Sequence, residues 1–263
     1  MDNAMYSALF GALSTEHRMN GVANNLANVN TTGYKRDLMA FKDTISMYAH
    51  DHIMEPMAAI RDKKFFPDPQ HISRTRIATS VTDFQQGGLK VTNNPLDLAI
   101  SGPGFFKVET PEGEFYTRNG HFTLNQEGVV MTAQGWPVLS EGGPITVPPG
   151  FKQITVAENG RMFADGEEVG QLRLVDVENP GDLEKQGSNM FRARPGTTIE
   201  EIEPEASRSW VAQGFLETAN VDVVYEMVNM IETQRHFEAL QKVMQTSNAI
   251  DKESTTRVGR GRV

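Results

Sequence analysis

Apolar residues recur every seven positions through the first thirty residues of the chain. This spacing predicts one amphipathic helix over residues 2–29, whose stripe consists of Met5, Ala8, Ala12, Thr15, Met19, Val22, Leu26 and Val29. A narrow stripe of mostly small residues suits a seam between helices better than the face of a globular core. The sequence therefore predicts that this first element packs against another helix.

Residues 220–250 return to a helical pattern at the other end of the chain. Their apolar face consists of Val223, Val224, Met227, Val228, Met230, Ile231, Phe237, Leu240, Val243 and Met244. The polar tail over residues 252–263 is expected to be disordered at its end. Two long helices with apolar faces most simply pair as one helical domain. Because a narrow seam buries little apolar surface against the entropy of ordering both helices, we expect the pair to need neighbouring chains.

The region between the helices has a different texture. Residues 36–80 contain Pro56, Pro67 and Pro69 and show mixed periodicity, which predicts an extended connector with poor internal packing. From residue 81 onward glycine-containing turns separate short β-type runs, at 104–108, 114–118, 121–124, 129–132, 153–156 and 171–177. The predicted fold class is α+β, divided into an N-terminal helix in 1–35, the connector in 36–80, a barrel- or sandwich-like all-β module in 81–215, and a C-terminal helix and tail in 216–263.

Composition excludes several classes of function. The net charge of -9 argues against a general binder of nucleic acids or anionic membranes, which needs a basic face. The absence of cysteine excludes disulfide scaffolds, thiol nucleophiles and thiolate metal sites. No apolar run approaches the roughly 18 residues of a membrane span. The first basic residue is Arg18, so the sequence predicts no cleaved secretory signal.

The sequence shows no set of residues that indicates catalysis. His50 and His52 are two positions apart, which does not align them on a helix face, and no third histidine completes a metal set nearby. Nucleophile-elbow, zinc-protease and phosphate-loop patterns do not occur in the chain. We therefore expect no enzyme activity, no cofactor, no metal site and no small-molecule substrate.

Asparagines are concentrated where the first helix is expected to end. Asn24, Asn25 and Asn28 can form a polar helix face that leads into a cap. Alternatively, their amides can make hydrogen bonds across a subunit interface, since each amide both donates and accepts and Asn24 and Asn28 share a face. The residues themselves favour neither interpretation.

Four segments together resemble a known family. Residues 23–36 (ANNLANVNTTGYKR) are similar to the N-terminal signature of the bacterial flagellar rod and hook proteins, and residues 93–106 (NNPLDLAISGPGFF) to their central motif. Residues 116–139 resemble the hairpin region that follows this motif, and residues 217–243 resemble the C-terminal helix. The resemblance runs nearly end to end and in order. Residues 143–148 and 235–238 look more like the proximal rod subunits of the family than the distal ones.

The resemblance implies a structural subunit of the flagellar basal-body rod that transmits torque across the periplasm. It implies export through the flagellar export apparatus without signal cleavage, and assembly with other rod subunits and with itself through the terminal helices. The expected assembly interface contains Met5, Leu9, Ala12, Met19, Val22, Asn24, Asn25, Leu26, Asn28, Val223, Met227, Ile231, Phe237 and Met244.

Two alternatives stay open from the sequence. The first is a distal rod subunit of the same family. The second is an extracellular glycan-binding module, which needs an exposed aromatic platform. The only tryptophans are Trp136 and Trp210, and both lie among β-type residues, where packing in a core is the simpler expectation.

Overall fold

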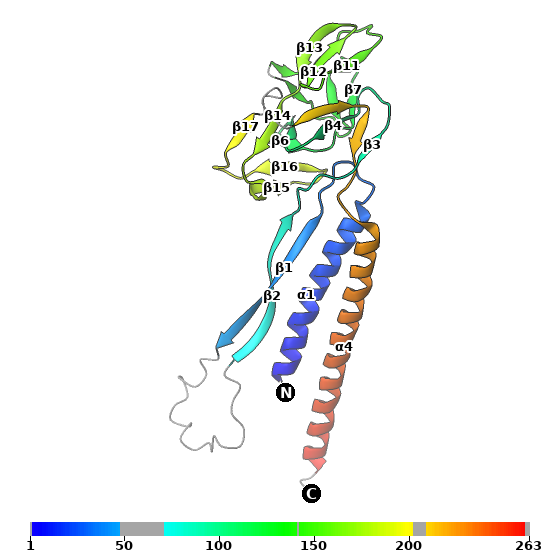
Figure 1. Cartoon of the computed structure of the whole chain (residues 1–263). Coiled ribbons are helices and arrows are strands. Elements are labelled where there is room, and N and C mark those ends of the chain that lie inside the picture. Colours follow the sequence, from blue (N-terminus) through cyan, green and yellow to red (C-terminus); the bar gives the residue numbers. More distant parts are fainter. Residues whose placement is uncertain (1, 48–70, 141, 202–208, 261–263) are drawn as a thin grey trace. The chain divides into compact units, whose positions relative to one another are not determined.

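The computed structural model describes residues 2–47, 71–140, 142–201 and 209–260, with a helix at each end of the chain and strands between them (Figure 1). The chain divides into two compact units. We call the first the helical unit; it consists of Met1–Asn24, Leu38–Val81 and Val224–Val263. We call the second the β unit; it consists of Asn25–Asp37 and Thr82–Val223. Helices at both ends and a largely β centre confirm the α+β fold class.

The first helix, α1 (Asp2–Ala27), lies where its periodicity predicted. The predicted stripe is its less exposed face: Ala8, Ala12 and Val22 are buried, and Met5 and Met19 are half-buried. A side chain at Gly11 would meet Leu240 of α4 at 3.3 Å, so the two helices touch at this point. Small residues on this face thus permit close approach.

The predicted connector contains two strands. β1 (Asp37–Met47) and β2 (His71–Thr82) form a two-stranded sheet, while residues 48–70 lie outside the described part of the chain. Alternating apolar residues in the sequence of β1 suit a strand with one covered face. The methyl group of Met39 lies 2.6 Å from where a Cβ would stand at Gly21 of α1, so β1 packs on that helix inside the helical unit. The sequence did not predict this contact with α1, and the internal packing of the connector stays a prediction.

The second helix, α4 (Val223–Arg260), presents a different face from the predicted one over its first turns. Glu226 and Thr233, seven residues apart, are buried at 3% and 1% exposure. The apolar residues expected on the inner face there are instead exposed, namely Val223, Val224, Met227, Val228 and Ile231. Farther along, Phe237, Leu240 and Met244 are half-buried and continue the seven-residue spacing. The sequence prediction placed the most hydrophobic residues on the inner face. In the structure, the buried positions instead follow seven-residue spacing from Glu226.

The second helix extends farther than the predicted residues 220–250, because α4 continues to Arg260. Arg257 pairs with Glu253 one turn earlier at 2.6 Å, an i,i+4 pair that supports a helix. The first glycine of the tail is Gly259, near the end of the helix. Residues 261–263 lie outside the described part of the chain, so the end of the tail is untested.

The β unit is built around a six-stranded antiparallel sheet in the order β15-β16-β6-β5-β14-β17. Its strands are β5 (Phe105–Thr110), β6 (Gly113–Thr117), β14 (Leu174–Val177), β15 (Leu183–Lys185), β16 (Met190–Ala193) and β17 (Ile199–Glu201). A short 3-10 helix, Pro180–Asp182, leads into β15. The strand runs predicted at residues 104–108, 114–118 and 171–177 are confirmed here to within three residues at each end.

Smaller sheets complete the β unit. A three-stranded sheet contains β11 (Ile154–Val156), β12 (Arg161–Ala164) and β13 (Glu167–Gln171). Four two-stranded sheets pair β18 (Trp210–Gln213) with β4 (Leu98–Ser101), β19 (Phe215–Glu217) with β3 (Leu89–Val91), β7 (Phe122–Leu124) with β8 (Val130–Thr132), and β10 (Gly143–Pro144) with β9 (Leu139–Ser140). Many short antiparallel strands joined by glycine turns match the predicted all-β texture.

Two hydrophobic cores fill the β unit, and β5 contributes to both. Successive side chains of a strand point to opposite faces, so Phe106 enters one core with Phe122 while Phe105 enters the other with Phe191. The rings of Phe106 and Phe122 meet edge to face at 5.2 Å. Gly120 permits this packing, because a Cβ there would stand 1.5 Å from the carbonyl oxygen of Leu98.

One core expectation is wrong. Trp210 is 49% exposed, whereas its neighbour Val211 is buried. The alternation of β18 gives the inward position to Val211 and turns the indole outward.

Candidate assembly surface and buried ion cluster

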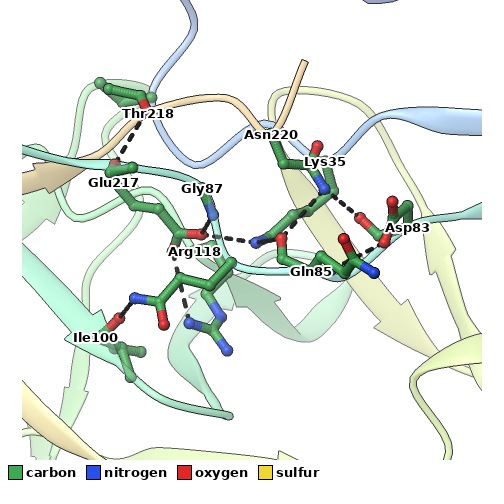
Figure 2. A network of polar contacts seen from close by, with 12 residues as sticks. Lys35, Asp83, Gln85, Gly87, Ile100, Arg118, Glu217, Thr218 and Asn220 are labelled. Atoms are coloured by element: carbon green, nitrogen blue, oxygen red, sulfur yellow. Dashed lines mark hydrogen bonds and ion pairs between the residues drawn. The ribbon is translucent and has the colours of Figure 1, made fainter. Parts of the chain in front are cut away.

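Three charged side chains meet inside the β unit, far from one another in the sequence (Figure 2). The Glu217 carboxylate accepts hydrogen bonds from the Lys35 ammonium at 2.7 Å and the Gly87 amide at 2.9 Å, and its second oxygen lies 3.5 Å from an Arg118 nitrogen. The exposed fractions of the three side chains are 1% for Lys35, 5% for Arg118 and 0% for Glu217. We call these three residues the ion cluster.

The ion cluster holds two cations and one carboxylate. Desolvation by burial lowers the pKa of Lys35, against the opposing attraction of Glu217. Burial likewise lowers the pKa of Arg118, whose guanidinium lies 5.1 Å from the centre of the Phe105 ring. The Arg118 Nε is buried with no hydrogen-bond partner in the described part of the chain. The three residues together carry one net positive charge, and Glu217 is the carboxylate that both cations contact.

The chain passes between its two units at four places, after residues 24, 37, 81 and 223. Within the β unit, side-chain amides join the segments that lie beside these four crossing points. Asn25 donates to the Asp37 carbonyl at 3.0 Å and accepts from the Asp37 amide at 3.0 Å. Asn220 accepts from the Arg36 amide at 2.8 Å and donates to the Asp83 carbonyl at 2.8 Å. Two asparagines thus fix the backbone beside the crossing points.

This geometry bears on the asparagine-rich segment. Asn25 is buried at 2% exposure, and its side-chain oxygen also accepts a hydrogen bond from the Tyr34 hydroxyl at 3.1 Å. Its amide is therefore engaged inside its own chain, a role that neither sequence interpretation foresaw. Asn24 is exposed and Asn28 is half-buried. Whether these two meet another subunit stays a prediction.

The helical unit leaves many large apolar side chains in solvent. Val224 is the most exposed of them at 71%. Others of this kind on the two helices are Tyr6, Leu9, Leu13, Tyr225, Met227, Val228, Ile231, Val243 and Ile250. We call these nine residues, together with Val224, the apolar helix surface. Large exposed apolar patches mark surfaces that bind other proteins.

The predicted interface residues fall into three groups. Leu9, Val223, Met227 and Ile231 are exposed, as an interface with another chain requires. Ala12 and Val22 are buried within the single chain. The half-buried positions are Met5, Met19, Leu26, Phe237 and Met244.

A groove of about 520 Å³ lies elsewhere in the β unit, lined by Asn93, Leu96, Leu124, Phe151, Lys152 and Gln213 among others. Among the described residues, neither tryptophan lines this groove, and no group of three or more metal-ligating side chains forms. His50 and His52 lie outside the described part of the chain. No described helix is long and apolar enough to cross a bilayer.

Sequence reasoning missed the ion cluster and the role of Asn220. Lys35 and Glu217 are 182 positions apart, and a lone lysine or glutamate carries no local pattern that indicates burial. Only the pairing of the two distant segments brings them together.

Comparison with known proteins places the chain in a family. Residues 5–35 match the flagella basal body rod protein family, residues 99–164 the flagellar hook protein FlgE/F/G D1 domain, and residues 212–257 the flagellar basal body rod FlgEFG protein C-terminal region. These matches coincide with α1, the core of the β unit and α4.

Whole-length relatives agree. The flagellar basal-body rod protein FlgF of Caulobacter vibrioides is 34% identical over 262 residues, 99% of either chain. The FlgG proteins of Borreliella burgdorferi (34% identical; 94% of this chain, 96% of the relative) and Bacillus subtilis (32%; 96% and 98%) also match. The resemblance predicted from the sequence is confirmed: the chain belongs to the flagellar basal-body rod protein family, whose members are structural proteins rather than enzymes.

Proposed function

We propose that this chain is a subunit of the proximal part of the flagellar rod and assembles with other rod subunits through its two terminal helices. The apolar helix surface is the observation that carries this proposal. A monomer gains nothing from exposing Val224, Met227 and Ile231 on consecutive turns of α4, whereas a neighbouring chain can bury them.

The less exposed faces of the two helices support pairing of α1 with α4. The less exposed positions of both helices follow seven-residue spacing, which suits a left-handed helix seam, and Gly11 and Leu240 touch. In the proposed assembly this seam holds the two helices together, and the outward apolar residues bind neighbouring copies. Met5, Met19, Phe237 and Met244 then serve the seam, while Leu9, Met227 and Ile231 serve contacts between subunits.

A pair of matched substitutions tests this role. Val224→Asp places a charge on the apolar helix surface, and Gln234→Asp places the same charge at an exposed polar position of α4. In cells of the source bacterium that lack the chromosomal copy, we expect Val224→Asp to reduce incorporation into purified basal bodies at least about tenfold and Gln234→Asp to leave it unchanged. Equal incorporation of both variants would contradict assembly through this surface.

The proximal position is supported by the FlgF relative, which aligns with this chain over 99% of both lengths. The FlgG relatives have similar identity, so a distal rod subunit is the second candidate. Quantitative mass spectrometry of purified basal bodies separates the two. We expect this chain at low copy beside the other proximal components; clearly higher copy would move it to the distal rod.

Export without a cleaved signal completes the proposal. Relatives that match this chain over almost its whole length are named flagellar basal-body rod proteins. The flagellar export apparatus is the proposed route. Intact N-terminal residues on the chain recovered from basal bodies are the expected result, and a shortened N-terminus would contradict this part.

The glycan-binding alternative keeps one observation in its favour, the exposed indole of Trp210. One tryptophan is a small platform for a sugar, and it does not line the groove. A glycan array with the full chain and with Trp210→Ala tests this candidate. Specific binding that is lost in the variant would support it.

A further inference from the structure

Two flanks of the β unit come from opposite ends of the chain and lie against each other. Residues 28–37 follow α1, and residues 215–222 precede α4. The Gly33 amide donates to the Glu217 carbonyl at 2.8 Å, and the Asn220 amide donates to the Tyr34 carbonyl at 3.3 Å. We call these segments the N-flank and the C-flank.

We infer that the N-flank and the C-flank form one cooperative element, so that loosening either flank releases the other. The contacts between them are reciprocal and of several kinds. Backbone hydrogen bonds run in both directions, the Lys35 ammonium binds the Glu217 carboxylate, and the Arg36 amide donates to the Asn220 side chain. Neither flank satisfies its buried polar groups by itself.

Burial makes these contacts costly to lose. Lys35 and Glu217 are fully enclosed, and Tyr34 is 5% exposed. A buried polar or charged group that loses its partner incurs most of its desolvation cost, whereas a paired group does not. If the C-flank moved away, the Lys35 ammonium would lose its hydrogen bond to Glu217 and keep the one to the Gln85 carbonyl at 2.7 Å.

A third segment, residues 83–87, contacts both flanks. Asn220 donates to the carbonyls of Asp83 and Gln85, and Arg36 pairs with Asp83 at 2.9 Å. Residues 83–87 therefore contact the N-flank through Arg36 and Lys35 and the C-flank through Asn220 and Glu217. This shared partner extends the coupling beyond direct contacts.

The coupling has a consequence for the end of α1 and the start of α4. The end of α1 and the first residue of α4 belong to the β unit, and each is joined to it by one of these flanks. Order at the end of α1 and at the start of α4 is therefore linked, through contacts that lie entirely inside the β unit. The paired flanks thus order the end of α1 and the start of α4 together.

Hydrogen exchange of the full chain tests the coupling with two matched amides. Asn220→Ala removes the side chain that holds the C-flank, and Asn25→Ala removes the one that holds the N-flank. We expect Asn220→Ala to accelerate exchange in residues 28–37 about tenfold, a shift of ~1.4 kcal/mol. Asn25→Ala should accelerate exchange in residues 215–222 similarly. The control Gln171→Ala removes a hydrogen bond to Asn159 in the same unit and should change neither flank.

The strands β12 and β13 serve as the internal reference for global loosening. The double variant Asn25→Ala/Asn220→Ala should accelerate both flanks by about the product of the two single effects, because both substitutions lower the free energy of the same opening event. Unchanged exchange in the opposite flank, or a double variant in which each flank accelerates no more than it does in one single variant, would overturn the inference. Should the reference strands also accelerate, Asn220→Ser, with a shorter polar side chain, gives the same comparison.

Discussion

The two units of this chain handle charged and apolar side chains in opposite ways. Segments 25–37 and 82–223 hold 22 acidic and 12 basic residues, a net charge of -10, yet their core encloses Lys35, Arg118 and Glu217. The remaining segments hold 12 acidic and 13 basic residues, a net charge of +1, and leave apolar side chains in solvent. The β unit thus encloses charged side chains in its core, whereas the proposed assembly would cover the apolar side chains that the helical unit exposes.

The sharpest test of the self-sufficient β unit is Glu217→Gln. It removes the one carboxylate shared by two buried cations, so we expect the free energy of unfolding of this unit to fall by about 3–5 kcal/mol. Urea unfolding followed by the fluorescence of Trp136 and Trp210 measures the change. Glu168→Gln, which removes a half-exposed partner of Arg161 at 4.0 Å, is the control and should cost at most about 1 kcal/mol. Equal costs would refute the special status of Glu217.

Lys35→Met should cost less than Glu217→Gln, about 1–2 kcal/mol. The substitution leaves Arg118 beside Glu217 as a balanced pair and relieves the desolvation of the ammonium, but the Gln85 carbonyl loses one of its two donors and keeps the Asn220 amide. The same urea experiment ranks the two variants. A larger cost for Lys35→Met than for Glu217→Gln would contradict the prediction that the carboxylate is the most critical member of the ion cluster.

Alkaline pH sharpens this prediction. Because burial lowers the pKa of Lys35, the unfolded state holds more protons than the folded state between that lowered pKa and 10.5, so stability from this group rises with pH in this window. Burial raises the pKa of Tyr116, and stability from that group falls as pH rises above 10.0. The difference between wild type and Lys35→Met isolates the lysine. It should shift in favour of wild type as the pH approaches 10.5, and a constant difference would count against the predicted linkage.

The smallest effect is expected on the helical unit. Met227→Ser removes an exposed apolar side chain of α4, so unfolding of the free chain should change by no more than about 0.5 kcal/mol. The same variant should incorporate poorly into basal bodies. Thermal unfolding and basal-body mass spectrometry give the two readouts. A large loss of stability in the free chain would show that Met227 packs within its own subunit.

Local patterns predicted the elements better than their partners. Heptad spacing placed α1 and its buried stripe, and the Asn119-Gly120 turn marked the hairpin region that packs on Phe106, because these signals lie within a few residues. The inner face of α4 was predicted wrongly. Glu226 and Thr233 are buried although they are polar, so a search for hydrophobic residues could not identify them. The joining of Lys35 to Glu217 depends on strand pairing across the chain, which no local pattern encodes.

Hydrogen exchange of the free, unassembled chain tests the contrast between the units most directly. We predict slow exchange in the core strands β5, β6 and β14 and in residues 28–37, and exchange at least about a hundredfold faster in residues 5–22 of α1 and 224–250 of α4. Assembly into rods should then slow exchange in both helices. Helices as well protected as β5 in the free chain would contradict the account, because the helical unit would then be stable without neighbours.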